Sequence, residues 1–339
     1  MGVDLGGLLI YTPQRLQDFR GKVIAIDAYN ALYQFLAIIR QPDGTPLMDR
    51  RGRVTSHLSG LIYRTSNVLQ RGILPIFVFD GTPNPLKLGV LQARAGIRAR
   101  AEAEWQEARK AGDLERARRK AQQAVRLTDP MLDSAQELLG LMGVPMVQAP
   151  SDGEAQTSHM VAKGDAWATG SQDHDALLFG STRLVKNLAL SGRRKLPRRN
   201  EYVTVRIELI RLAENLASLG VSREQLVDMA LLIGTDFNDG IKGIGPKKAL
   251  KLIREHGDLE ATLAATGLDI EEREEVRQIF LDPDVSDEYD LSWEDPDGPA
   301  ILEFLCRGFD FSEERVRTAI QKLEEGAASR GQSRLDRWT

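Results

Sequence analysis

The sequence predicts an α/β fold in which helices flank a mainly parallel central sheet. Short, entirely apolar runs such as Val23–Ile26 and Ile76–Phe79 are typical of strands that are buried on both faces. These runs alternate with helical segments, which is the β-α-β pattern of such a sheet. Acidic residues follow several of the runs, and parallel sheets bind their ligands beyond the carboxyl ends of the strands. The 339 residues suffice for a substantial core in one large or two smaller domains.

Residues 22–80 are predicted to form the first part of this alternation. In chain order we expect a strand at 22–27, amphipathic helices at 31–40 and 56–70 with a polar hairpin or loop at 41–52 between them, and a strand at 73–80.

The segment 88–128 has a different character, because it is rich in Ala, Arg, Glu, Lys and Gln and has little apolar periodicity. Two exposed helices joined by a short turn at 111–113 fit this composition. Within 94–126, ten basic residues stand against five acidic ones. The excess of positive charge would suit the guiding of a phosphate backbone. A solvated helical pair with internal salt bridges explains the same residues equally well.

The remaining chain continues the alternation and then becomes helical. We expect a helix at 131–142, a strand at 144–149, a helix after the Asp152–Glu154 loop, strands near 166–171 and at 182–187, a basic loop at 192–200, and helices from 205 onward. The stretch 258–303 carries sixteen acidic residues against two arginines, which indicates a surface turned away from any polyanion. Residues 326–339 are small and polar for most of their length and are expected to form a flexible tail.

Seven carboxylates are the candidate metal ligands, and most of them follow apolar runs. They are Asp27, Asp80, Asp152, Glu154, Asp173, Asp175 and Asp236. Acids gathered at one edge of a sheet repel one another unless a cation neutralises them. Oxygen ligands without His or Cys favour Mg²⁺ or Mn²⁺, and several carboxylates suit a two-metal phosphoryl-transfer site. Taken singly, each acid could equally be a helix cap or a solvated loop residue.

The segment GIKGIGPKKAL indicates a helix-hairpin-helix. Gly243 and Gly245 flank Ile244 in a tight turn, and Pro246 suits the first position of the next helix. Lys247 and Lys248 add positive charge beside a helix N-terminus, which favours a phosphate. Such an element binds the duplex backbone without reading sequence. The alternative is an ordinary Gly-Pro connection between helices.

The last eight residues carry the spacing Q-x-x-L-x-x-W at Gln332, Leu335 and Trp338. One helical turn would place Leu335 and Trp338 on the same face, where they would form an apolar plug for a partner's pocket. The alternative is a tail that packs on its own domain.

Bulk properties exclude several classes of protein. The single cysteine, Cys306, rules out an internal disulfide and a Cys-cluster zinc site. No apolar stretch approaches the length of a membrane span, and the N-terminus lacks the basic start of a secretory signal. We therefore expect a cytoplasmic protein that does not contact a membrane.

Taken together, these motifs resemble those of the structure-specific 5′ nucleases, and most closely the archaeal flap endonucleases. The resemblance extends from Gly2 to Trp338 and is most specific in VIAIDAYNALYQFL, IFVFDGTPNPLK, SQDHDALLFGS and LLIGTDFNDGIKGIGPKKAL. It implies an α/β fold with a helical arch and a helix-hairpin-helix DNA-binding element. It also implies a single nuclease domain at 1–325, made of an N-terminal region at about 1–98, the arch at about 88–128 and an internal region at about 129–256 that includes the helix-hairpin-helix at 240–253. The flexible tail at 326–339 would then carry a motif for a sliding clamp (PCNA) at 332–339.

The same resemblance implies roles for individual residues. The seven acids would hold two Mg²⁺ ions, for which Mn²⁺ can substitute. Lys87 and Arg94 would contact the scissile phosphate, and Tyr33 would stack on the unpaired terminal base. A K⁺ ion would bind at the helix-hairpin-helix. The implied activity is that of a monomeric 5′ flap endonuclease with 5′→3′ exonuclease activity, acting on branched DNA in Okazaki fragment maturation and repair.

Three positions depart from the family pattern. Asp152 stands where glutamate is usual, Thr339 stands where an aromatic residue is expected, and Asp4 is an acid beside Gly2 that the pattern does not explain. Other functions remain open at this point. They are a processive 5′ exonuclease or junction resolvase of the same superfamily, a clamp-tethered DNA-binding protein without catalysis, and an RNase of similar fold.

Overall fold

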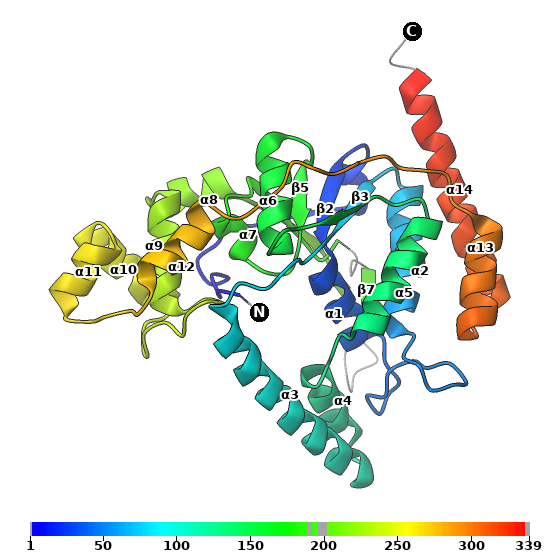
Figure 1. The fold of residues 1–339 in the computed structure, drawn as a ribbon, viewed down its shortest axis with the longest axis horizontal. Helices are drawn as coiled ribbons and strands as arrows, with labels where there is room; N and C mark the ends of the chain where they lie inside the picture. The colour runs from blue at the N-terminus through cyan, green and yellow to red at the C-terminus, as the bar shows by residue number, and fades with distance from the viewer. Residues whose placement is uncertain (1, 189–191, 196–201, 336–339) are drawn as a thin grey trace.

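The computed structural model describes residues 2–188, 192–195 and 202–335. The central sheet consists of β1 (Thr12–Gln14), β2 (Val23–Asp27), β3 (Leu74–Phe79), β4 (Met146–Gln148), β5 (Ala168–Gly170), β6 (Arg183–Lys186) and β9 (Ile207–Arg211). Their order is β1-β9-β6-β5-β2-β3-β4 (Figure 1). The strands from β6 to β4 are parallel, whereas β9 and β1 extend one edge in antiparallel fashion. The prediction of a mainly parallel central sheet flanked by helices is confirmed.

The helices lie on both faces of this sheet and beyond its edges (Figure 1). They are α1 (Ala28–Ile38), α2 (Ser56–Gln70), α3 (Lys87–Lys110), α4 (Leu114–Gln123), α5 (Asp129–Leu141), α6 (Gly153–Lys163), α7 (Asp175–Leu178), α8 (Leu212–Leu219), α9 (Arg223–Ile233), α10 (Pro246–His256), α11 (Leu259–Thr266), α12 (Arg273–Leu281), α13 (Gly298–Leu302) and α14 (Glu313–Leu335), together with a 3₁₀ turn, η1 (Leu16–Phe19), and a π-helical turn, η2 (Glu303–Arg307). Local signals set several boundaries. Ser222 and Gln225 form a capping box at the start of α9, and Pro246 occupies the first turn of α10.

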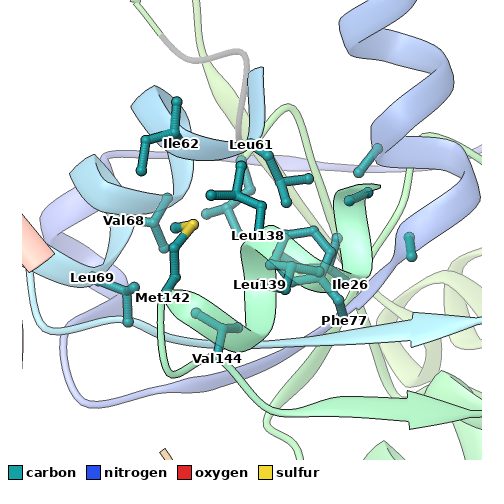
Figure 2. Packing of buried hydrophobic residues seen from close by; sticks show 14 of the residues in the cluster. Ile26, Leu61, Ile62, Val68, Leu69, Phe77, Leu138, Leu139, Met142 and Val144 are labelled. Atoms are coloured by element: carbon teal, nitrogen blue, oxygen red, sulfur yellow. The ribbon is translucent and has the colours of Figure 1, made fainter. Parts of the chain in front are cut away.

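The two faces of the sheet bury alternate residues of the central strands β2 and β3. Ile26 of β2 faces the core formed with α1, α2, α5 and α14, whereas its neighbour Ala25 faces α6. Figure 2 shows Leu61 of α2 and Leu138 of α5 gathered with Ile26 and Phe77 in the first of these cores. Because β2 and β3 are covered on both faces, they contain consecutive apolar residues, and this is why short apolar runs predicted these two strands from the sequence.

The chain from residue 205 to 211 is mostly strand, where helices were predicted from 205 onward. β9 lies between β6 and β1, and β8 (Tyr202–Val205) pairs with β7 (Gly192–Lys195) in a separate hairpin. The prediction of a loop at 192–200 is therefore wrong for residues 192–195. Ile207 and Leu209 are buried at alternate positions of β9. This alternation is short and is followed directly by the helical periodicity of α8, so it could not be recognised as a strand in the sequence.

The C-terminal helix also differs from the prediction. A flexible tail was expected from residue 326, but α14 continues as a helix to Leu335. It packs along α2, where Lys322 donates a hydrogen bond to Asn67 at 2.6 Å and Gln70 donates to Glu325 at 2.6 Å. The small residues near 326 thus permit close packing of α14 on α2. A polar, Gly-containing composition does not reveal this role in the sequence.

A buried histidine predicts how the stability of this core depends on pH. His57 of α2 is 1% exposed, and its Nε2 lies 3.0 Å from Ser134 Oγ of α5. Burial lowers the pKa of His57 from 6.5 to about 4. As the pH falls below 6.5, the unfolded chain therefore binds a proton that the folded chain does not, so stability decreases. The associated loss approaches about 2 to 3 kcal/mol at pH 4.

We expect His57→Gln to remove this contribution, so that the variant loses less unfolding free energy than the wild type between pH 7 and pH 4. Urea unfolding at the two pH values measures the difference. Equal losses in both proteins would contradict the assignment.

Candidate active site

Six of the seven predicted metal ligands lie at the carboxyl ends of four neighbouring parallel strands. Asp27 ends β2, Asp80 follows β3, Asp152 and Glu154 follow β4, and Asp173 and Asp175 follow β5. These strands are adjacent in the order β5-β2-β3-β4, so their carboxyl ends meet at one edge of the sheet. The seventh acid, Asp236, lies in the segment that joins α9 to α10, and it pairs with Arg94 of α3.

Burial and mutual repulsion raise the pKa of four of these acids. For Asp27, burial followed by the charge of Asp80 raises the pKa to about 8. Burial is also the main reason that the pKa of Asp80 rises to about 6. The pKa values of Glu154 and Asp175 lie well above their ordinary range, because both side chains are buried and face the charge of Asp173. The acids therefore form a cluster whose negative charge is only partly neutralised by the protein.

Hydrogen bonds from neighbouring groups orient the acids. The backbone N–H of Asn30 donates to Asp27 at 3.0 Å, and that of Gly153 donates to Asp80 at 2.8 Å. Ser171 Oγ donates to Glu154 Oε1 at 2.8 Å and accepts from the backbone N–H of Asp173 at 3.1 Å. None of these hydrogen-bonding groups was predicted from the sequence. The available signals were the cap position of Asp27 before α1 and the Ser-x-Asp spacing at 171–173.

Lys87 and Arg94 are the two cations of the site, and both lie at the start of α3. Lys87 forms an ion pair with Asp152, and its Nζ lies 4.8 Å from the centre of the Phe237 ring. Arg94 binds Asp236 through both terminal nitrogens, with 3.0 Å between Nη1 and Oδ2. Burial acts against ionisation of Asp236, but the hydrogen bonds and charge of Arg94 hold its pKa below the ordinary value. The two cations thus engage the outer acids of the cluster.

The donor set fits divalent metal ions. All seven candidate ligands offer carboxylate oxygens, the donors that Mg²⁺ and Mn²⁺ prefer. Burial and neighbouring negative charge raise the pKa of Asp27, Glu154 and Asp175, so added positive charge would stabilise their ionised forms. Across the described residues, no three acidic, His or Cys side chains form a ready-made metal site. Asp152 and Asp236 are engaged by Lys87 and Arg94, so a metal ion would compete with these contacts.

The helices α3 and α4 form the paired element predicted for 88–128. They project from the sheet and share a small core of Trp105, Ala108, Ala117 and Ala121 (Figure 1). Trp105 Nε1 donates to the backbone carbonyl of Asp43 at 3.0 Å, and Arg109 lies 3.3 Å from the Asp43 carboxylate. The paired helices are thus held at two places. Arg94 contacts Asp236 beside the acid cluster, and Trp105 contacts the polar segment at 41–52.

We expect Trp105→Ala to loosen this paired element without unfolding the protein. Truncation of a buried tryptophan removes about 3 kcal/mol or more of packing, and here the loss falls on a four-residue core. Amide hydrogen exchange should accelerate at least about tenfold in α3 and α4 and stay unchanged in α2 and α5. Leu114→Ala is the matched control, because Leu114 is 53% exposed on α4. Unchanged exchange in the Trp105 variant would contradict this packing role.

The α9–α10 connection has the form predicted for a helix-hairpin-helix. Gly243 has φ of +85°, a left-handed conformation that favours glycine, and buried Ile244 anchors the turn. Lys247 and Lys248 are exposed in the first turn of α10, with Gly245 as its N-cap. This is the position at which a phosphate would meet a helix N-terminus, so the arrangement suits the predicted duplex contact.

Two further predicted groups lie on helices. Tyr33 is half-buried on α1, one turn after Tyr29, whose pKa is raised by burial and by the charge of Asp80. Gln332 and Leu335 belong to the last turns of α14, whereas Trp338 lies outside the described residues. The roles of these residues in stacking and in clamp binding stay predictions.

Comparison with known proteins places the site in two matched regions. The XPG N-terminal domain matches residues 8–101, and the XPG I-region matches residues 143–236. These ranges contain all seven acids together with Lys87 and Arg94.

Full-length relatives carry one shared name. The chain is 51% identical over 338 residues to Flap endonuclease 1 of Archaeoglobus fulgidus, covering 100% of both chains. It is 48% identical over 338 residues to Flap endonuclease 1 of Methanococcoides burtonii, again covering 100% of both. The solved structure of flap endonuclease-1 from Methanococcus jannaschii is similar with a TM-score of 0.77 and 41% identity, covering 97% of this chain and 100% of that one.

Proposed function

The chain belongs to the flap endonuclease family, and on this premise we propose that it removes 5′ flaps from branched DNA by hydrolysing a phosphodiester bond. We further propose 5′→3′ exonuclease activity and a role in Okazaki fragment maturation and repair. The observation that supports this proposal most directly is the buried acid cluster at the carboxyl ends of β5, β2, β3 and β4, with two cations beside it. Among the described residues, no helix is both long and apolar enough to cross a bilayer.

The acids would hold two Mg²⁺ ions, for which Mn²⁺ can substitute. When bound, such a pair activates a water molecule and stabilises the leaving oxygen of an in-line displacement. The acids Asp27, Glu154 and Asp175 are buried and face the charges of other acids, so a bound cation would offset the largest repulsion at these three side chains.

Lys87 and Arg94 would act by exchanging partners. In the free protein they neutralise Asp152 and Asp236. An incoming phosphate offers each cation an alternative anion, and its binding would release both acids toward the metal site. Substrate binding and completion of the ligand set would thus be linked through the same two side chains.

The DNA would be held by elements on two sides of the acids. The basic pair α3 and α4 would guide the 5′ flap, and Tyr33 would stack on its unpaired base. Lys247 and Lys248 at the start of α10 would hold the duplex, with a K⁺ ion at the turn. The acid-rich stretch from 258 to 303 would face away from the DNA.

A panel of DNA substrates tests this function. A 5′ flap, a nicked duplex and a four-way junction of matched sequence should be compared under single-turnover conditions with Mg²⁺. We expect the flap to be cut at least about tenfold faster than the other two, since the paired helices engage a single strand and the hairpin a duplex. Preference for the nicked duplex would indicate an exonuclease, and preference for the junction would indicate a resolvase. No turnover on any substrate would favour a non-catalytic DNA-binding protein.

The C-terminal motif predicts a separable partner. Deletion of residues 332–339 should abolish stimulation of flap cleavage by the sliding clamp (PCNA) and leave the basal rate within about twofold, because the acids and the DNA-binding elements lie elsewhere in the chain. Arg334→Ala, which leaves Gln332, Leu335 and Trp338 in place, is the control and should retain stimulation. Stimulation of the deletion variant would show that the clamp binds another surface.

A further inference from the structure

The N-terminal segment contacts two of the candidate metal ligands through its backbone. The N–H of Gly2 donates to Asp173 Oδ2 at 2.5 Å, and the N–H of Val3 donates to Asp175 Oδ1 at 2.8 Å. A Cβ on residue 2 would lie 2.0 Å from Asp175 Oδ2, so a side chain at this position would displace the Asp175 carboxylate. Val3 and Leu5 are buried and anchor the segment against the protein. The position of this backbone therefore determines where both carboxylates lie.

A histidine between the two acids holds the segment in turn. His174 Nδ1 lies 3.3 Å from the carbonyl oxygen of Val3, and His174 Nε2 lies 2.9 Å from Lys186 Nζ at the end of β6. Because an ammonium group has donors only, Nε2 is the acceptor of this pair, and the remaining ring proton is on Nδ1. Nδ1–H therefore donates to Val3. Lys186 thus selects the tautomer of His174 that can hold the N-terminal segment.

Asp4, the acid that the sequence left unexplained, belongs to the same arrangement. Its Oδ1 accepts a hydrogen bond from the N–H of Gly6 at 3.1 Å, and Gly6 itself approaches the His174 ring. Burial lowers the pKa of Lys186, and the charge of Asp4 is one of those that oppose this effect. The charges of Glu208 and Asp173 oppose the effect of burial more strongly, so Asp4 makes the smallest of these three contributions.

We propose that His174 and Lys186 are positioning residues for Asp173 and Asp175, acting through the N-terminal segment. Lys186 orients the His174 ring, His174 holds the carbonyl of Val3, and the N–H groups of Gly2 and Val3 fix the two carboxylates. The inference rests on the proposed function insofar as these carboxylates bind metal. His174 and Lys186 would act in this way without contacting metal or DNA themselves.

The test uses Lys186→Met, which removes the donor, and Lys186→Arg, which retains one. Hydrogen exchange of the peptide covering residues 2–9 is measured in the full-length protein without metal. We expect exchange to be at least about tenfold faster in Lys186→Met and close to wild type in Lys186→Arg. Lys163→Met is the control, because Lys163 pairs with Asp287 and Asp165 on the protein surface.

The second readout is the Mg²⁺ concentration that gives half the maximal single-turnover rate on a 5′ flap. Residues behind metal ligands typically change metal affinity by 10- to 100-fold, so we expect a rise of about tenfold in Lys186→Met, with KM for DNA changed less than about twofold. His174→Phe, which keeps the ring shape without nitrogen atoms, should reproduce both effects.

Unchanged exchange and unchanged Mg²⁺ dependence in Lys186→Met and His174→Phe would overturn the proposal. Equal impairment of Lys186→Arg and Lys186→Met would also overturn it, because the hydrogen-bond donor would then not matter. A wild-type protein that does not cut flaps would refute the proposed function alone, since the exchange measurement needs neither metal nor DNA.

Discussion

Asp173→Ala is expected to slow flap cleavage by about a thousandfold or more, which corresponds to about 4 kcal/mol of transition-state stabilisation. Asp173 lies at the centre of the cluster, because its charge contributes to the raised pKa values of Asp27, Glu154 and Asp175. Its loss would remove the oxygens of one of the seven proposed metal-binding carboxylates, and no neighbouring neutral group would replace them. The fold should be at least as stable as that of the wild type, since removal of one charge relieves the repulsion among the others.

Single-turnover cleavage of a labelled flap substrate measures this effect, with flap binding measured separately in Ca²⁺. Binding should stay within about threefold, because the proposed DNA contacts lie on α1, α3, α4 and α10. Asp133→Ala is the matched control, since Asp133 is an exposed acid on α5. Cleavage by the Asp173 variant at the wild-type rate would refute the assignment of the cluster as the catalytic centre.

Arg94→Ala is expected to slow cleavage by about 100- to 1000-fold, the usual effect of losing a group that stabilises developing negative charge. Its bidentate contact with Asp236 shows that the guanidinium can reach the edge of the acid cluster. The pair is partly exposed, so its loss should reduce the unfolding free energy by only about 1 kcal/mol. Arg94→Lys should recover part of the rate, because the charge returns without the planar fork.

Rapid-quench kinetics at saturating enzyme separates this chemical effect from weaker DNA binding. Arg71→Ala provides the control, since Arg71 is exposed at the end of α2 and has no proposed role in DNA binding. An unchanged rate in Arg94→Ala would show that the contact with Asp236 is structural only.

The strand-end acids could be predicted because their signal is local. Asp27 and Asp80 each follow a run of consecutive apolar residues, and parallel strands bring such run ends to one edge of a sheet. The paired helices were equally visible, because their composition differs from that of every other segment. Both features arise from a few consecutive residues and need no knowledge of the tertiary structure.

Contacts between distant segments could not be predicted in the same way. Arg94 and Asp236 are 142 positions apart, and either residue alone looks like a solvated charge. His174 between two aspartates gives no sign that Lys186 and Val3 lie on either side of its ring. The strand β9 escaped notice because its alternation is brief and merges with that of α8. Such features depend on how elements pack, and the sequence shows the elements without their neighbours.

The central claim is that the acids at the ends of β5, β2, β3 and β4 form a metal-dependent centre for flap cleavage. The most direct test is single-turnover cleavage of a 5′ flap by the wild-type protein as Mg²⁺ is titrated from zero in the presence of a chelator. We expect no product without free Mg²⁺ and, at low concentration, a rate that rises with about the square of the Mg²⁺ concentration, because two ions would take part. Cleavage that persists in excess chelator would contradict this claim.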